Sequence, residues 1–181
     1  MRGLVLMVLL VFSTLGHTAD AQQPLPELGT QVPPAEIVPL TPDLEPLRLL
    51  LGTWDASGGG KPGASTGEFT FESQAGGHAV LRRNESATPE GRHADVMLIH
   101  SEGQTGMTAV YLDSEGHVIH YAVTAPDPKT VVFLSEPAGG GPGFRLSYHL
   151  NEGGVLATKF EIAAPGSSEF STYLEGTAKR K

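Results

Sequence analysis

The chain has 181 residues, of which 39% are hydrophobic, so it has room for one domain of ordinary size with one core. A net charge of -8 with only 18% charged residues disfavours nucleic-acid and anionic-membrane partners, which require clustered lysine and arginine. Because there is no cysteine, disulfides, thiolate metal sites and cysteine nucleophiles are excluded.

The first 21 residues have the pattern of an export signal. Arg2 gives a basic start, residues 4–12 are an unbroken apolar run, and Ala19 and Ala21 are small residues at the positions that a signal peptidase reads. A membrane-spanning helix needs about 20 apolar residues, so this run is too short to remain as an anchor. We expect cleavage after Ala21, export to the periplasm or the medium, and no stable membrane insertion afterwards.

Residues 22–41 are predicted to form an extended linker. Seven prolines lie between Gln22 and Pro46 without a sustained apolar period, which favours a semi-rigid, solvated segment. Such a segment serves as a spacer, a tether or a recognition peptide. The folded domain is then expected over residues 42–181.

A short helix is predicted at the start of this domain. Thr41 is placed as the N-cap, Pro42 stands in the first turn, and Gly52 ends the run. The leucines expected on one face are Leu44, Leu47 and Leu51. We expect this leucine face to pack against other apolar residues of the domain.

The rest of the chain reads as ten strands. Short β-branched and aromatic runs alternate with glycine, proline, aspartate and asparagine. The expected strands are 53–57, 67–73, 79–86, 94–101, 107–113, 117–124, 130–135, 143–150, 155–162 and 170–178. All prolines after Pro46 fall between these runs, as ladder hydrogen bonding requires. Hairpin-length gaps predict antiparallel pairing of neighbours.

Apolar and polar residues alternate along these strands, most clearly over 143–150 and 155–162. Each strand therefore has one apolar face and one polar face. A sheet that closes into a barrel leaves no unpaired edge strand and buries its apolar face inside. We therefore predict an all-β fold: a ten-stranded antiparallel up-and-down barrel, with the short N-terminal helix covering one end. Ten strands enclose more space than eight, so a ligand-sized interior is expected.

The segment from Leu49 to Asp55, with glycine and tryptophan after a leucine helix, resembles the first strand of calycin barrels, which include lipocalins, fatty-acid-binding proteins and nitrobindins. The resemblance implies that Trp54 closes the base of the barrel and that a basic side chain of the last strand, Lys179 or Arg180, packs on it. The layout also resembles small exported calycin-like proteins of bacteria whose function is unassigned.

Nitrobindin-like barrels bind haem through a histidine of the final strand, and Tyr173 stands at that place here. Tyrosine can ligate ferric haem. However, the loss of the histidine, together with Ala56 where the nitrobindin pattern has glycine, disfavours haem. We expect no cofactor.

Two adjacent arginines are candidate ligand contacts. Arg82 and Arg83 must point to opposite faces of their strand, so one enters the barrel. There it would bind a ligand carboxylate or pair with an internal acid such as Glu85. The sequence leaves open which arginine faces inward. Arg92 and His93 precede the next predicted strand and are placed in a loop at the barrel mouth.

The histidines show no spacing that is specific for a metal pair, so no metal site is predicted. His117 points inward near a rim or is simply a polar residue beside a turn. His149 lies on a polar face and is expected on the exterior.

Three functions remain. The first is an exported barrel that binds a small apolar or amphipathic molecule. Its expected ligand contacts are Trp54, Arg82, Arg83, His100, His117, Tyr121, Tyr148 and Tyr173. The second is an isomerase or hydratase in the same cavity, with His100 or His117 as the acid–base group. The third is a barrel filled by its own side chains, with a structural or interaction role.

Overall fold

The structure is a computed structural model that describes residues 40–103, 106–135 and 140–181. These residues belong to one compact unit, Ala35–Lys181. The predicted export signal and nearly all of the predicted linker lie outside the described residues and stay predictions. Within the described ranges, no helix has the length and apolar character needed to cross a membrane.

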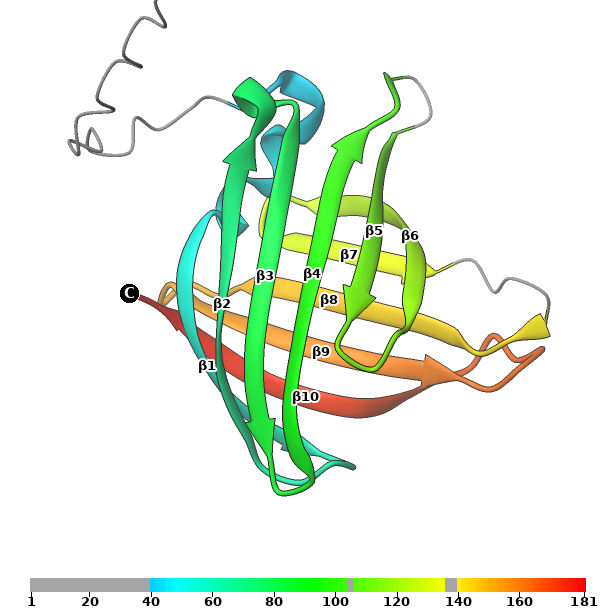
Figure 1. The fold of residues 1–181 in the computed structure, drawn as a ribbon. Coiled ribbons are helices and arrows are strands. Elements are labelled where there is room, and N and C mark those ends of the chain that lie inside the picture. The colour runs from blue at the N-terminus through cyan, green and yellow to red at the C-terminus, as the bar shows by residue number, and fades with distance from the viewer. Residues whose placement is uncertain (1–39, 104–105, 136–139) are drawn as a thin grey trace, which may run out of the picture. The chain divides into compact units, whose positions relative to one another are not determined.

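The described chain forms ten strands and two short helical turns (Figure 1). The strands are β1 (Gly52–Gly60), β2 (Ser65–Gln74), β3 (Ala79–Thr88), β4 (Gly91–Ser101), β5 (Met107–Asp113), β6 (Val118–Asp127), β7 (Thr130–Ser135), β8 (Gly143–Leu150), β9 (Val155–Ala163) and β10 (Phe170–Arg180). Each strand pairs antiparallel with its neighbour in sequence, and β10 pairs with β1. The predicted closed, ten-stranded, antiparallel barrel is confirmed.

The barrel has two different ends. The closed end carries η1 (Pro42–Leu50), η2 (Ala75–Gly77) and the last residues of β10. The open end carries the turns that join β1 to β2, β3 to β4, β5 to β6 and β9 to β10. Every strand runs between these ends, so residues near the end of β3, the start of β4 and the end of β5 meet at the open end.

The predicted helix at the closed end is the 3₁₀ helix η1. Its buried leucines are Leu44, Leu47 and Leu50, so the prediction that Leu51 completes the face is wrong. A 3₁₀ helix has three residues per turn, which aligns every third side chain, and Pro46 inside the helix lacks the N–H that an α-helical bond would need. Thr41 makes no side-chain cap hydrogen bond.

Trp54 seals the base of the barrel beneath η1. Its side chain is fully buried, and Nε1 donates a hydrogen bond to the carbonyl of Leu50 at 2.8 Å. The guanidinium carbon of Arg180 lies 4.2 Å from the centre of the Trp54 ring, and Arg180 also donates to the carbonyls of Leu51 and Leu49. Of the two expected basic residues, Arg180 is therefore the one that stacks on Trp54.

The closed half of the barrel is filled with its own side chains. Phe71 and Tyr148 meet edge to face with ring centres 5.5 Å apart, and Phe133 continues this cluster at 6.0 Å from Tyr148. The apolar residues Val80 and Met97 are also completely buried. These buried side chains pack against one another and form the structural core of the barrel.

One expectation about proline is wrong. Pro126 lies inside β6 rather than between strands. The pairing of β6 with β7 shifts register between Thr124 and Asp127, so Pro126 stands where the ladder is interrupted. A proline lacks an N–H donor and is tolerated at such an irregularity.

Candidate functional site

Polar side chains line the inner wall formed by β3, β4 and β5, and they extend toward the open end. This polar wall consists of Arg82, Asn84, His93, Asp95, Tyr111 and Asp113. The register places the three strands side by side, with Asp95 opposite both Asn84 and Asp113. These side chains form one connected set of hydrogen bonds.

Arg82 is the inward arginine, and its partner is an internal acid. Its guanidinium forms an ion pair with Asp95 through Nη1 and Oδ1, and the two side chains are only 9% and 3% exposed. Burial alone would lower the pKa of Arg82, but the charge of Asp95 more than offsets this and raises it. Nε of Arg82 is buried without a hydrogen-bond partner.

Arg83 points outward and pairs with Glu72 on the barrel surface at 2.6 Å. Glu85, which the sequence suggested as the internal acid, also faces outward and lies 3.5 Å from Arg92. Strand alternation explains both positions, because residues 83 and 85 share the face opposite to Arg82.

His93 is the central group of the polar wall. Its Nε2 lies 3.2 Å from Asp95 Oδ2 and 3.1 Å from the Tyr111 hydroxyl, and its Nδ1 lies 3.0 Å from Glu115 Oε1. The hydrogen bond to Asp95, supported by Glu115, raises the pKa of His93 to about 9. The imidazole is therefore cationic at neutral pH. Burial raises the pKa of Tyr111, which keeps its hydroxyl protonated.

Asp113 completes the polar wall at the rim. Its Oδ1 accepts hydrogen bonds from the backbone N–H groups of Glu115 at 3.0 Å and His117 at 2.9 Å. Its Oδ2 lies 2.9 Å from Nδ1 of His117. Burial would raise the pKa of Asp113, but the hydrogen bonds from His117 and Glu115 lower it.

Aromatic side chains form a second wall on β8, β9 and β10, which are not adjacent to β3, β4 and β5 in the barrel. Phe144 on β8 and Phe160 on β9 stack with their centres 6.0 Å apart and their planes 10° apart, and Tyr173 on β10 meets Phe160 edge to face at 6.1 Å. All three are half-buried, in contrast to the fully buried rings of the closed half. Tyr173 lies at a bulge where the pairing of β10 with β9 shifts register.

The structure brings some predicted site residues together and separates others. Tyr121 and Tyr148 lie inside and are buried. His100 lies on the outside of β4, 3.3 Å from the hydroxyl of Thr108. His117 stands in the turn before β6 and its side chain is 65% exposed. Neither histidine lies inside the barrel as an acid–base group would.

Sequence reasoning placed His93 in a loop, whereas β4 begins at Gly91 and includes it. The sequence pattern was sufficient to place His93 correctly. Ile99 and Met97 face inward, and counting back from them two residues at a time puts Asp95 and His93 on the same inner face. The proximity of Asp113 depends on the register of β4 with β5, which the sequence pattern does not set.

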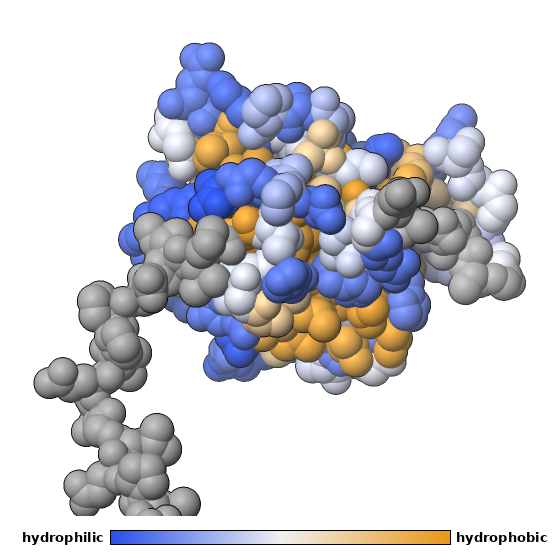
Figure 2. Space-filling view, turned by 90° about the horizontal axis from the view of Figure 1, so that it is seen from above, coloured by the Kyte–Doolittle hydropathy of each residue, from blue (hydrophilic) through white to orange (hydrophobic). Residues whose placement is uncertain are grey.

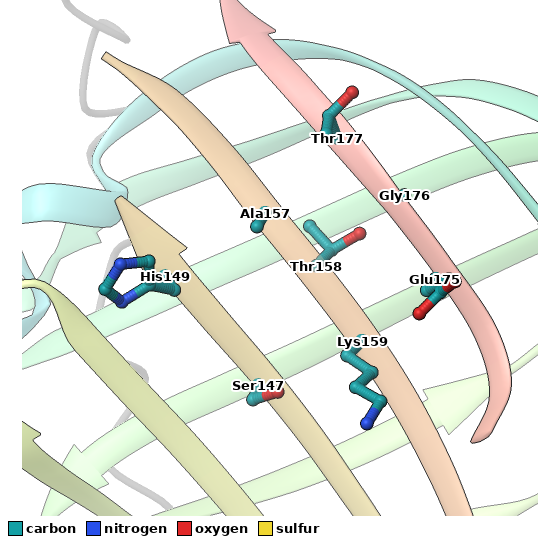
Figure 3. A pocket seen from close by; sticks show the side chains of 8 residues that line it. All are labelled: Ser147, His149, Ala157, Thr158, Lys159, Glu175, Gly176 and Thr177. Carbon is teal, nitrogen blue, oxygen red and sulfur yellow. The ribbon is translucent and has the colours of Figure 1, made fainter. Parts of the chain in front are cut away.

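Two features of the outer surface are separate from these walls. A shallow groove of about 450 Å³ crosses β8, β9 and β10 (Figure 3). It is lined by Ser147, His149, Ala157, Thr158, Lys159, Glu175, Gly176 and Thr177. Apolar side chains also reach the outer surface, as the orange areas in Figure 2 illustrate. Those we call the outer apolar patch are Val96, Leu98, Leu112 and Val118, on adjacent strands β4, β5 and β6.

No protein-family model matches the chain, and no curated protein matches it. Among solved structures it is similar to designed β-barrels. One is described as EF1p2_mFAP2b bound to DFHBI, with a TM-score of 0.42, 16% identity, and coverage of 74% of this chain and 95% of that one. Another is described as a de novo designed fluorescence-activating β-barrel, with a TM-score of 0.40, 12% identity, and coverage of 78% of this chain and 100% of that one.

Proposed function

We propose that the barrel binds a small amphipathic molecule through its open end. The observation that carries this proposal is the aromatic wall of Phe144, Phe160 and Tyr173, which stays half-buried while the rings of the closed half are fully buried. A site with apolar surface on one side and a few convergent polar groups on the other is typical of small-molecule binding. The export that the sequence pattern predicts remains part of this proposal.

The apolar part of the ligand would lie against the aromatic wall. Covering apolar surface contributes about 25 cal/mol per Å² removed from water. The stacked rings of Phe144 and Phe160 offer the larger part of this surface, and Tyr173 borders it. The filled closed half below them limits how deeply a ligand can enter.

The polar end of the ligand would meet His93 and Tyr111. Asp95 already neutralises Arg82, so this arginine is not available to hold a ligand carboxylate. Within the polar wall, the positive charges of Arg82 and His93 are balanced by the carboxylates of Asp95 and Asp113. The half-exposed Glu115 beside His93 at the rim adds one further negative charge. A hydroxyl or ammonium group therefore fits better than a carboxylate. Of the two roles that the sequence left open for an inward arginine, the internal ion pair is the one observed.

Displacement of a fluorescent dye by dodecylamine, dodecanol and dodecanoate tests this proposal. We expect the acid to bind at least tenfold more weakly than the amine. Replacing Phe160 with alanine should weaken amine binding about tenfold, since it removes apolar contact worth about 1.4 kcal/mol. The matched control is Phe170→Ala, because Phe170 lies on the outer face against Arg145. Tightest binding of the acid, or equal effects of the two substitutions, would contradict the proposal.

A further inference from the structure

Two histidines and two carboxylates meet at the open rim, where β4 and β5 approach the turn that follows β5. We call His93, Asp113, Glu115 and His117 the rim cluster. His93, Asp113 and Glu115 each offer a ligand atom, and these atoms all lie within 4.8 Å of one another. Nδ1 of His117 lies 2.9 Å from Asp113 Oδ2 and 3.9 Å from Glu115 Oε2.

The distances in the rim cluster are close to those of a tetrahedral metal site. Zinc binds nitrogen and oxygen at about 2.0 to 2.2 Å, so neighbouring ligand atoms are about 3.4 Å apart. His93 Nδ1 and Glu115 Oε1 are 3.0 Å apart, and the two His117 distances lie on either side of 3.4 Å. His117 is not one of the three groups whose ligand atoms all lie within 4.8 Å of one another, so its exposed side chain would have to rotate to become a fourth ligand. His93 would release its Nδ1 proton on binding the ion.

Groups outside the rim cluster hold His93 in the orientation that a metal ligand requires. While Nδ1 faces Glu115, Nε2 lies 3.2 Å from Asp95 Oδ2. Metal-binding histidines commonly donate their second ring N–H to a carboxylate in this way, which fixes the ring. Asp95 is itself fixed by Arg82 and by Asn84, whose Nδ2 donates at 2.8 Å.

We propose that the rim cluster binds one divalent transition-metal ion of the zinc class, with His93 binding through Nδ1. Imidazole nitrogens combined with carboxylate oxygens suit zinc and its neighbours rather than magnesium or calcium, which prefer oxygen ligands alone. Backbone N–H groups hold Asp113 Oδ1, whereas Oδ2 lies beside Nδ1 of His117, so Oδ2 is the oxygen that would bind the ion. This proposal does not depend on the binding of a small molecule.

Calorimetric titration of the full chain with Zn²⁺, after removal of metals by a chelator, tests this site. We expect one ion per chain. Replacing Glu115 with glutamine should weaken the affinity at least tenfold, and the variant should fold normally because this side chain is 53% exposed. His93→Gln should have at least the same effect. Loading with Co²⁺ should give visible absorption bands typical of four-coordinate nitrogen and oxygen ligation in the unaltered chain.

The matched controls are His149→Gln and Glu152→Gln, which remove the same groups from β8 and the following turn, near the closed end. Both should leave zinc affinity unchanged, as histidine and glutamate outside the rim cluster are not ligands. Absence of zinc binding by the unaltered chain would overturn the proposal. So would binding that survives both rim substitutions, or binding that a control removes.

Discussion

At the scale of single residues, the ion pair of Arg82 and Asp95 sets the character of the barrel interior. Both side chains are almost entirely buried, and each charge depends on the other because transfer of an unpaired ion from water costs several kcal/mol. Asp95 also contacts Asn84 and His93, so the pair orients the whole polar wall.

Replacing Arg82 with methionine should lower the free energy of unfolding by about 3 to 5 kcal/mol, since it strands the carboxylate of Asp95. The double change Arg82→Met with Asp95→Leu should lower it less than Arg82→Met alone. Arg83→Met is the control and should cost less than about 1 kcal/mol, because the pair of Arg83 with Glu72 is exposed. Urea unfolding measures all three, and equal losses for the two arginines would refute this account.

Glu161 provides a pH-dependent prediction. It faces outward yet is buried, because Arg145 Nε donates to it at 2.6 Å and Lys159 Nζ lies 2.9 Å away. The hydrogen bond from Arg145 is the main reason that the pKa of Glu161 falls from 4.5 to about 2. A lowered pKa stabilises the fold above about pH 4.5, and this stabilisation is lost as the pH falls through about 2.

Glu161→Gln should therefore lower the free energy of unfolding by about 1 to 3 kcal/mol at pH 7. The difference from the unaltered protein should shrink between pH 4.5 and pH 2. Unfolding curves recorded across this range measure it. Glu90→Gln, in an exposed turn, should show no such change; a difference for Glu161 that stays constant down to pH 2 would count against this assignment.

At the scale of elements, the strands could be predicted because alternation and turn residues are local signals. The segment 143–150 shows this most directly, since β8 begins and ends at the predicted residues. The type of η1 was missed because leucine spacing alone does not separate three from 3.6 residues per turn. The rim cluster was missed because the register of β5 with its neighbours brings Asp113 and His93 together.

Glycines at the seam of β1 and β10 are a second element-scale feature. Gly58 lies opposite Gly176, and a Cβ at Gly58 would overlap the carbonyl oxygen of Glu175. Gly58→Ala should therefore lower the free energy of unfolding by about 1 to 3 kcal/mol, as overpacking does. At the adjacent Gly59 the nearest atom to a Cβ is 3.6 Å away, so Gly59→Ala should cost clearly less. Thermal unfolding compares the two, and the reverse order would be inconsistent with a tight seam.

At the scale of the whole molecule, the two halves of the barrel differ in the side chains that they enclose. The closed half, sealed by Trp54, Arg180 and η1, supplies the packed core. The open half holds the aromatic wall and the polar wall, between which we propose that a ligand binds. The proposed function thus combines two of the functions considered from the sequence, a filled core in one half and ligand binding in the other.

The proposed function requires no haem. Tyr173 stands where the resemblance to nitrobindins implies the haem ligand, but its ring packs against Phe160 in the aromatic wall. We expect no strong Soret band from the purified protein, and none after incubation with hemin. A stoichiometric haem complex that Tyr173→Phe abolishes would show that this expectation is wrong.

The most direct test of the central claim is to locate a bound amphipathic molecule by intermolecular nuclear Overhauser effects. With dodecylamine and isotope-labelled protein, we predict cross-peaks from the alkyl chain to the rings of Phe144 and Phe160. Cross-peaks only to the outer apolar patch or to the groove on β8, β9 and β10, or no cross-peaks at all, would contradict binding through the open end.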